Sequence, residues 1–171
     1  MGTVGDGDFE VFFTEVIGEA ISVTARVLED RGSAEDAAVE AMARAHLRWR
    51  TLSLDPFRRA WVLRVAINAA LDIQRSDRSR RAREARSETA AVGADFEQQV
   101  LDRIVLGGAL GKLPRRQREA VALRYLAGLS ERDAAAAMGV TAGSLKVHLR
   151  RGLAALGGPL TRGITGGVSD V

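Results

Sequence analysis

Apolar residues recur every three or four positions along most of the chain, the spacing expected for one face of an α-helix. One such stretch runs from Phe9 to Leu28. After a break at Asp30-Arg31-Gly32, a second stretch is expected to be capped by Ser33 and to end near Leu52, and a third runs from Phe57 to about Ser76. Residues that favour helices, such as Ala, Leu, Arg and Glu, are frequent, and β-branched runs are short. The pattern predicts an all-α protein that begins with a bundle of three or four helices.

A polar stretch separates this bundle from a second helical unit. Residues 79–96 are charged or small, so they are expected to extend the third helix into solvent and then to form a flexible linker. Helical spacing resumes at Glu97, and a helix from Arg115 to Leu126 is expected to begin after Pro114. The apolar positions expected on the inner side before it are Val100, Leu101, Ile104, Val105 and Leu110.

The predicted organisation is two small helical domains joined by a flexible linker. The expected parts are a disordered N-terminus (residues 1–8), a first domain (9–85), a linker (86–96), a second domain (97–156) and a flexible glycine-rich tail (157–171).

The second domain contains a helix-turn-helix pattern. Ser130 is placed to cap a short alanine-rich helix, Gly139 can adopt the positive φ of a sharp turn, and Thr141 can cap the next helix. In that next helix the inward positions are Leu145, Leu149, Leu153 and Leu156, and the outward face carries Ser144, Lys146, Val147, His148, Arg150 and Arg151. A packed helix with an outer face of donors and cations fits the major groove of DNA.

Charge is segregated along the chain, although the net charge is only +3. Residues 1–40 contain ten acidic residues and two arginines, whereas residues 112–151 contain nine lysines or arginines and three acidic residues. Six arginines also fall within residues 75–86. This asymmetry predicts an acidic end that meets one partner and basic surfaces that meet nucleic acid.

Composition excludes several other classes. The chain has no cysteine and two histidines, so disulfides, thiol catalysis and zinc fingers are excluded and no metal site is expected. No apolar run is long enough to span a membrane, and the acidic N-terminus predicts no secretory signal.

Short motifs in both halves match one family. In the C-terminal half they are Leu113-Pro114, Gln117-Arg118-Glu119, Leu123-Arg124-Tyr125, Gly128-Leu129-Ser130, Met138-Gly139-Val140 and Gly143-Ser144-Leu145-Lys146. In the N-terminal half they are Ala34-Glu35-Asp36 with Glu40, Arg44 and Ala45, then Arg59-Ala60-Trp61, Leu63-Arg64, Ala66, Asn68 and Ala70-Leu71-Asp72. In this order the two sets resemble regions 4 and 2 of group IV, or extracytoplasmic function (ECF), sigma factors of the sigma-70 family.

The resemblance implies a factor that binds the β′ clamp and β flap of core RNA polymerase, recognises the −35 and −10 promoter elements and promotes DNA opening. It implies polymerase binding by Glu35, Asp36, Glu40 and Arg44, and −10 DNA binding by Arg64, Asn68, Asp72, Arg75 and Arg78. It implies −35 DNA binding by Ser144, Lys146, Val147, Arg150 and Arg151. Such a protein is not an enzyme, needs no cofactor, acts in the bacterial cytoplasm (on the nucleoid when in holoenzyme), and commonly has an anti-sigma partner.

The chain also departs from the family pattern. Val39 replaces the usual glutamine before the region 2.2 glutamate, Met42 and His46 replace aromatic residues, and Val147 replaces a serine. Two alternatives therefore stay open: a sigma-like decoy that cannot open DNA, and a DNA-binding regulator that uses only the helix-turn-helix. The second leaves the motifs of the N-terminal half unexplained.

Overall fold

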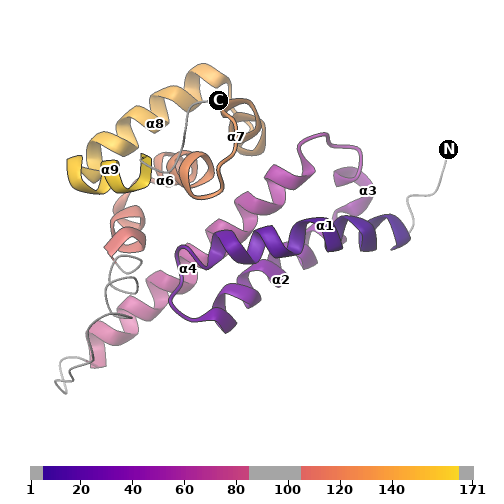
Figure 1. Cartoon of the computed structure of the whole chain (residues 1–171), viewed down its shortest axis with the longest axis horizontal. Helices are drawn as coiled ribbons and strands as arrows, with labels where there is room; N and C mark the ends of the chain where they lie inside the picture. The colour runs from indigo at the N-terminus through magenta and orange to yellow at the C-terminus, as the bar shows by residue number, and fades with distance from the viewer. Residues whose placement is uncertain (1–5, 85–104, 166–171) are drawn as a thin grey trace.

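The computed structural model describes residues 6–84 and 105–165, and all regular secondary structure within these ranges is helical. The first group of helices is a bundle of α1 (Asp6–Thr24), α2 (Arg31–Leu47) and the long α4 (Arg58–Glu84), with the short α3 (Trp49–Leu52) between α2 and α4. Figure 1 shows α1 and α2 lying along α4. The predicted all-α class and first bundle are confirmed.

Two boundaries of the bundle differ from the sequence prediction. Asp30, rather than Ser33, caps α2, because its carboxylate accepts a hydrogen bond from the Ser33 amide at 2.7 Å. The Asp30 carboxylate therefore takes the capping role, at the start of α2, that was expected for the Ser33 hydroxyl. Helix α1 already begins at Asp6, so the prediction of disorder is wrong for residues 6–8.

Alanines allow the three helices of the bundle to approach closely. The buried positions of α2 are mostly alanine, and they face Phe12, Val16 and Ala20 from α1 and Leu63 and Ile67 from α4. Trp49 is buried, with its ring centroid 5.0 Å from that of Phe12, so it belongs to the core of the bundle.

The far end of α4 extends beyond the bundle core. As predicted, the polar residues after Ser76 continue the helix, which ends at Glu84. Arg81 binds Glu29 at 2.9 Å, and this ion pair ties the extension to the turn after α1. The rest of the predicted linker lies outside the described residues, together with Val100, Leu101 and Ile104.

The second group of helices contains the predicted helix-turn-helix. After a helix at residues 105–112 come α6 (Arg115–Val121), a π-helical turn η1 (Ala122–Leu126), α7 (Glu131–Met138) and α8 (Ala142–Leu156). Ser130 and Thr141 cap α7 and α8, and Gly139 has a φ of 64° at the turn. Leu145, Leu149 and Leu156 are buried and Leu153 is partly buried. These predictions are confirmed.

Two predictions for this group are wrong. Val105 is 53% exposed rather than on the inner side, whereas Leu110 is buried. The tail predicted to be flexible from residue 157 forms α9 (Gly158–Thr165), which packs against α8. Ile164 is buried there, and the Thr161 hydroxyl donates to the Leu153 carbonyl at 3.0 Å. Burial of Ile164 and this hydrogen bond therefore hold in place a segment that was expected to be flexible because it is rich in glycine.

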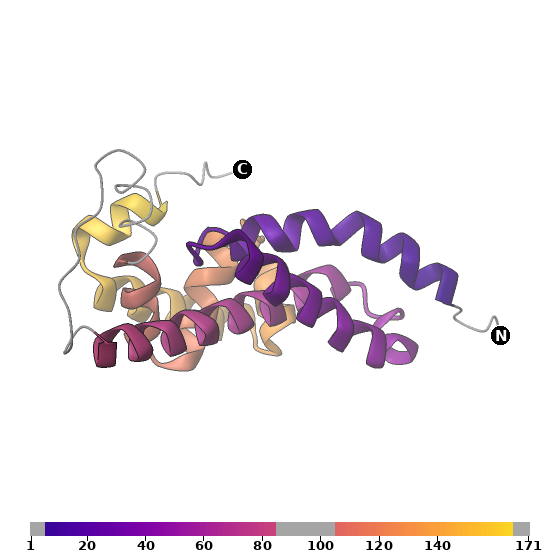
Figure 2. The same ribbon diagram turned by 90° about the horizontal axis from the view of Figure 1, so that it is seen from below.

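The second group of helices lies directly on α4. Helices α6 and α7 and the η1 turn all contact α4, and Figures 1 and 2 show α6 to α9 gathered on one side of it. No helix in the described part of the chain is long and apolar enough to cross a membrane. Helix α4, which carries the residues that the resemblance assigns to −10 DNA, is also the helix on which the second group packs.

Candidate nucleic-acid interface

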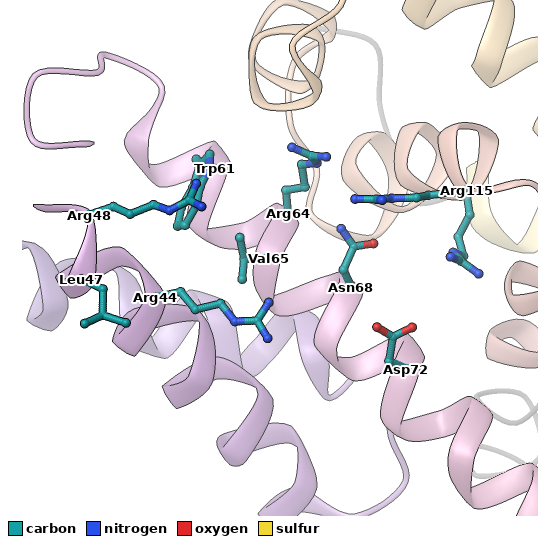
Figure 3. Close-up of a pocket in the computed structure, with 10 residues that line it drawn as sticks. Arg44, Leu47, Arg48, Trp61, Arg64, Val65, Asn68, Asp72 and Arg115 are labelled. Atoms are coloured by element: carbon teal, nitrogen blue, oxygen red, sulfur yellow. The ribbon is translucent and has the colours of Figure 1, made fainter. Parts of the chain in front are cut away.

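A cavity of about 740 Å³ lies between the two groups of helices, and its lining is strongly basic. Its walls are formed by Arg44, Leu47, Arg48, Trp61, Arg64, Val65, Asn68, Asp72, Arg115 and Arg118. Figure 3 shows Arg64, Asn68 and Asp72 spaced along one face of α4, with Arg115 opposite them on the second group. With five arginines and one carboxylate in its lining, this cavity has the charge that would favour an anionic ligand.

The carboxylate of Glu119 joins the two groups beside this cavity. Glu119 is on α6 and is only 1% exposed. Its Oε1 atom accepts hydrogen bonds from Arg64 Nη2 at 3.2 Å and from Asn68 Nδ2 at 3.1 Å, both on α4. Within α6, Arg115 Nε donates to the same oxygen at 3.2 Å and Arg116 Nη1 lies 3.5 Å from Oε2.

These donors keep Glu119 ionised. Burial by itself would raise the pKa of its carboxyl, but the positive charge of Arg64 and the hydrogen bonds from Arg115, Arg64 and Asn68 outweigh burial. The pKa of Glu119 therefore lies below its ordinary value of 4.5. A buried carboxylate with this many donors is a strong and specific contact between the two groups.

Further contacts between the groups surround the Glu119 cluster. Arg64 Nη1 donates to the Ala137 carbonyl on α7 at 3.0 Å. Arg26, after α1, donates to the Leu126 carbonyl at 2.6 Å, and the Arg132 guanidinium of α7 lies 5.5 Å from the Phe57 ring centroid. The interface thus has anchors well away from the cavity.

The other residues predicted to bind −10 DNA lie further along α4. Arg75 Nη1 pairs with Asp72 Oδ1 at 3.1 Å, and both side chains are more than half exposed. The guanidinium of Arg78 lies so close to Gly108 that a Cβ there would stand 2.0 Å from Arg78 Nη1. The structure therefore places all five predicted residues on α4, with Arg64, Asn68 and Arg78 facing the second group.

Several residues that the sequence did not assign to binding also line the cavity, among them Trp61, Arg48 and Arg118. Trp61 is partly buried, and the Arg48 guanidinium lies 5.8 Å from its ring centroid. Arg118 is 9% exposed, and its Nε has no hydrogen-bond partner among the described residues. Burial, together with the positive charge of Arg75, lowers the pKa of Arg118. Because the Arg118 guanidinium is buried and its Nε lacks a partner in the described part of the chain, a bound anion would stabilise it.

The residues predicted to bind −35 DNA are together on the outer face of α8. Lys146, Val147 and Arg150 are exposed there, as are Ser144 and Arg151. Lys146 Nζ lies 3.4 Å from Glu131 Oε2, but both side chains are well exposed, so the pair is weak. This face is free to enter a groove of DNA.

The residues predicted to bind polymerase lie along α2. Glu35 and Glu40 form exposed ion pairs with Arg31 at 2.8 Å and with Arg44 at 2.7 Å. Asp36 is exposed between them. Val39, which is 52% exposed, adds an apolar patch to this acidic face. A face with both apolar and acidic side chains is suited to a protein partner.

Glu119 is the main feature of the site that sequence reasoning missed. Its motif, Gln117-Arg118-Glu119, was recognised as a match, but a motif within α6 carries no information about which helix of the other domain it will meet. The only available signal was that Glu119 is a lone acidic residue that directly follows three arginines, at positions 115, 116 and 118. That signal indicates local ion pairs and does not identify Asn68 or Arg64 as partners.

Comparisons with known proteins identify similar proteins over most of the chain. The family model for Sigma-70, region 4 matches residues 103–156. The chain is 33% identical to the RNA polymerase sigma-E factor of Streptomyces coelicolor over 133 residues, or 77% of this chain and 73% of that protein. It is 34% identical to the ECF RNA polymerase sigma factor SigM of Mycobacterium tuberculosis over 134 residues, or 78% of this chain and 66% of that protein.

A solved structure shares the fold. The sigma factor RpoE, crystallised in complex with the anti-sigma factor NepR from Bartonella quintana, matches with a TM-score of 0.54 and 24% identity. The match covers 87% of this chain and 94% of that chain. The helical architecture, the region 4 match and the sigma-factor relatives agree, and the chain belongs to the ECF group of the sigma-70 family of RNA polymerase sigma factors.

Proposed function

We propose that this protein is a promoter-recognition subunit of bacterial RNA polymerase, in which α8 reads the −35 element, α4 reads and holds the opened −10 strand, and α2 docks on the polymerase. The observation that carries the proposal is the presence of two separate cation-bearing surfaces, on α4 and α8, in a chain of this family. A regulator that used only the helix-turn-helix would have no need for the first surface.

The −35 surface is suited to duplex DNA. The Gly139 turn sets α8 across α7, so that Lys146, Val147 and Arg150 project together toward base edges while Arg151 reaches a phosphate. Lysine and arginine donate to guanine, and the Val147 methyl groups can contact a thymine methyl.

The −10 surface is suited to unpaired DNA. The Asn68 side chain can hydrogen-bond an extruded base, and Arg64 and Arg75, which precede and follow it on α4, can hold phosphates. Opening DNA in this way needs tighter binding to the single strand than to duplex and no covalent chemistry, so the protein acts without catalysing a reaction.

The polymerase surface combines charge with apolar area. Asp36 and Glu40 on α2 would meet a basic surface of the β′ clamp, with Val39 adding apolar contact, while region 4 would meet the β flap. Opposite charge of this kind mainly accelerates and orients docking. An anti-sigma protein is a further expected partner, since the structural relative RpoE was solved with one.

The proposal is tested by transcription in vitro with core RNA polymerase from the bacterium that encodes the protein and fragments of its genomic DNA. Discrete transcripts that appear only with the protein are expected. Core binding without transcripts would support the decoy alternative, and neither transcripts nor core binding would support the plain DNA-binding regulator.

Point variants test the two proposed DNA surfaces separately. Arg150→Ala is expected to lower transcription about tenfold, because a lost base contact is worth roughly 1–3 kcal/mol. Arg162→Ala, which removes an exposed arginine from α9, is the matched control and should leave it unchanged. Asn68→Ala should allow polymerase binding but abolish opening, measured by permanganate reactivity of unpaired thymines.

A further inference from the structure

We infer that the cavity between the two groups of helices is a binding site for a nucleotide that carries two or more phosphate groups. The inference goes beyond the proposed function and does not depend on it. It rests on the lining of the cavity and on two guanidinium groups there, those of Arg48 and Arg118. The cavity volume of about 740 Å³ lies within the range of roughly 300–1,000 Å³ that is usual for small-molecule and cofactor sites.

Arg118, on α6, carries a buried charge that its neighbours do not neutralise. The residue is 9% exposed, and within the described residues its side chain forms no ion pair and no hydrogen bond. Arg64 Nε, in the same lining, is also buried without a hydrogen-bond partner there, and Arg64 shares the carboxylate of Glu119 with Arg115. Burial removes the water that would solvate a guanidinium, so its charge is costly without an anion. An anion in the cavity would be stabilised by both groups.

The end of the cavity near Trp61 is suited to a flat ring. Figure 3 shows Trp61, Leu47 and Arg48 together at one end of the cavity and Arg115 at the other. Trp61 is partly buried and Leu47 is exposed, and both line the cavity. The Arg48 guanidinium lies 5.8 Å from the Trp61 ring centroid and forms no ion pair with a described residue. A nucleobase can stack on an aromatic ring or on a guanidinium, and this stacking accepts any base.

The remaining arginines of the lining come from three helices. Arg44 lies on α2, Arg64 on α4, and Arg115 and Arg118 on α6. A guanidinium binds phosphate oxygens through a planar fork of N–H donors. Forks on three helices can engage several linked phosphates more fully than a single one. A ring at one end and linked phosphates along the arginines correspond to a nucleoside di- or triphosphate.

The cavity suits a small nucleotide better than a strand of DNA. Arg64 and Asn68, which we propose for the −10 strand, both donate to Glu119 in this arrangement, so these donors are already engaged. Part of the wall is supplied by Arg115 and Arg118 of α6, which belong to the second group of helices. A ligand of this cavity therefore contacts both groups at once and must fit within the space between them.

The first test is calorimetric titration of the full-length protein with ATP, tripolyphosphate and adenosine. The buffer contains no magnesium, which would otherwise screen the phosphates. ATP offers both a ring and phosphates, whereas each of the other probes offers only one of them. One ATP per chain is expected to bind about tenfold more tightly than tripolyphosphate, because stacking of the base adds to the affinity, and adenosine alone should show no binding. Equal affinities for ATP and tripolyphosphate would overturn the assignment to a nucleotide.

The second test removes arginines from opposite walls of the cavity. Arg118→Gln, on α6, and Arg48→Gln, directly after α2, should each weaken ATP binding about tenfold, the usual effect of losing a charge-assisted hydrogen bond. Arg83→Gln removes an exposed arginine of α4 that does not line the cavity, so this matched control should keep the parent affinity. Because Arg48 is exposed, its variant still tests the site if Arg118→Gln folds poorly. Equal losses in all three variants would indicate attraction to net charge and contradict a defined site.

Trp61→Leu separates recognition of the ring from recognition of the phosphates. This variant should bind ATP only about as tightly as tripolyphosphate, while its affinity for tripolyphosphate stays at the parent value. A parent-like preference for ATP in Trp61→Leu would refute the proposed place of the base.

These results are independent of the transcription assay. A protein that supports transcription with core polymerase but does not bind ATP would keep the proposed function and lose this inference. A protein that binds ATP with the expected pattern but supports no transcription would keep this inference and lose the proposed function.

Discussion

At the scale of single residues, Gly139 shows how one backbone angle sets the helix-turn-helix. Its φ of 64° lies in the left-handed region, and no neighbouring atom lies within 4 Å of an added Cβ. Gly139→Ala is therefore expected to cost only backbone strain, about 1–2 kcal/mol in the free energy of unfolding measured with urea. Gly143→Ala, at an ordinary helical position of α8, should leave stability equal or higher, and an equal loss in both variants would contradict the explanation.

The charge of Glu119 gives a second prediction at the residue scale. Because the folded protein lowers the pKa of this carboxyl below 4.5, its contribution to stability is complete above pH 4.5 and is lost as the pH falls through the lowered value. At neutral pH, Glu119→Gln should reduce the free energy of unfolding by about 1–3 kcal/mol. Denaturant titrations should show this difference shrinking below pH 4.5, and a difference that grows toward acid pH would be inconsistent with an ionised Glu119.

At the scale of elements, the contact between α6 and α8 depends on a missing side chain. A Cβ at Gly152 would lie 2.8 Å from Val121 Cγ2 and 3.2 Å from the Gln117 carbonyl oxygen, so the helices must separate to admit it. Gly152→Ala should destabilise the protein by about 1–3 kcal/mol in thermal unfolding. Gly18→Ala, at an open position within α1, should instead stabilise by up to about 1 kcal/mol.

The helical elements themselves were largely predictable from local sequence. Ser130, Thr141 and Gly139 act on neighbours within a few residues, so their roles as caps and turn could be inferred without the fold. Segment α9 could not, because its order depends on burial of Ile164 and on a hydrogen bond to Leu153 of the preceding helix.

At the scale of the whole molecule, two adjacent glycines test how closely the domains approach. A Cβ at Gly107 would collide with Gln74, which is buried and donates to the Val27 carbonyl at 3.1 Å, whereas one at Gly108 would meet the exposed side chain of Arg78. Because Arg78 can move aside and Gln74 cannot, Gly107→Ala should broaden the distribution of distances between spin labels attached at Val11→Cys on α1 and Ala154→Cys on α8. Gly108→Ala should leave the distance distribution narrow. A broader distribution for Gly108→Ala than for Gly107→Ala would contradict the close approach of Gly107 to Gln74.

The sequence by itself determined the helices and the helix-turn-helix, and it supplied the residues that we propose for two DNA surfaces and one polymerase surface. These features follow from periodicity, caps and motifs that act over a few residues. Only the tertiary structure decided which of those surfaces is open. The bonds of Arg64 and Asn68 to Glu119 join residues 55 and 51 positions apart, and the bond of Arg64 to Ala137 spans 73 positions. No local pattern specifies such pairings, because they depend on how two folded domains meet.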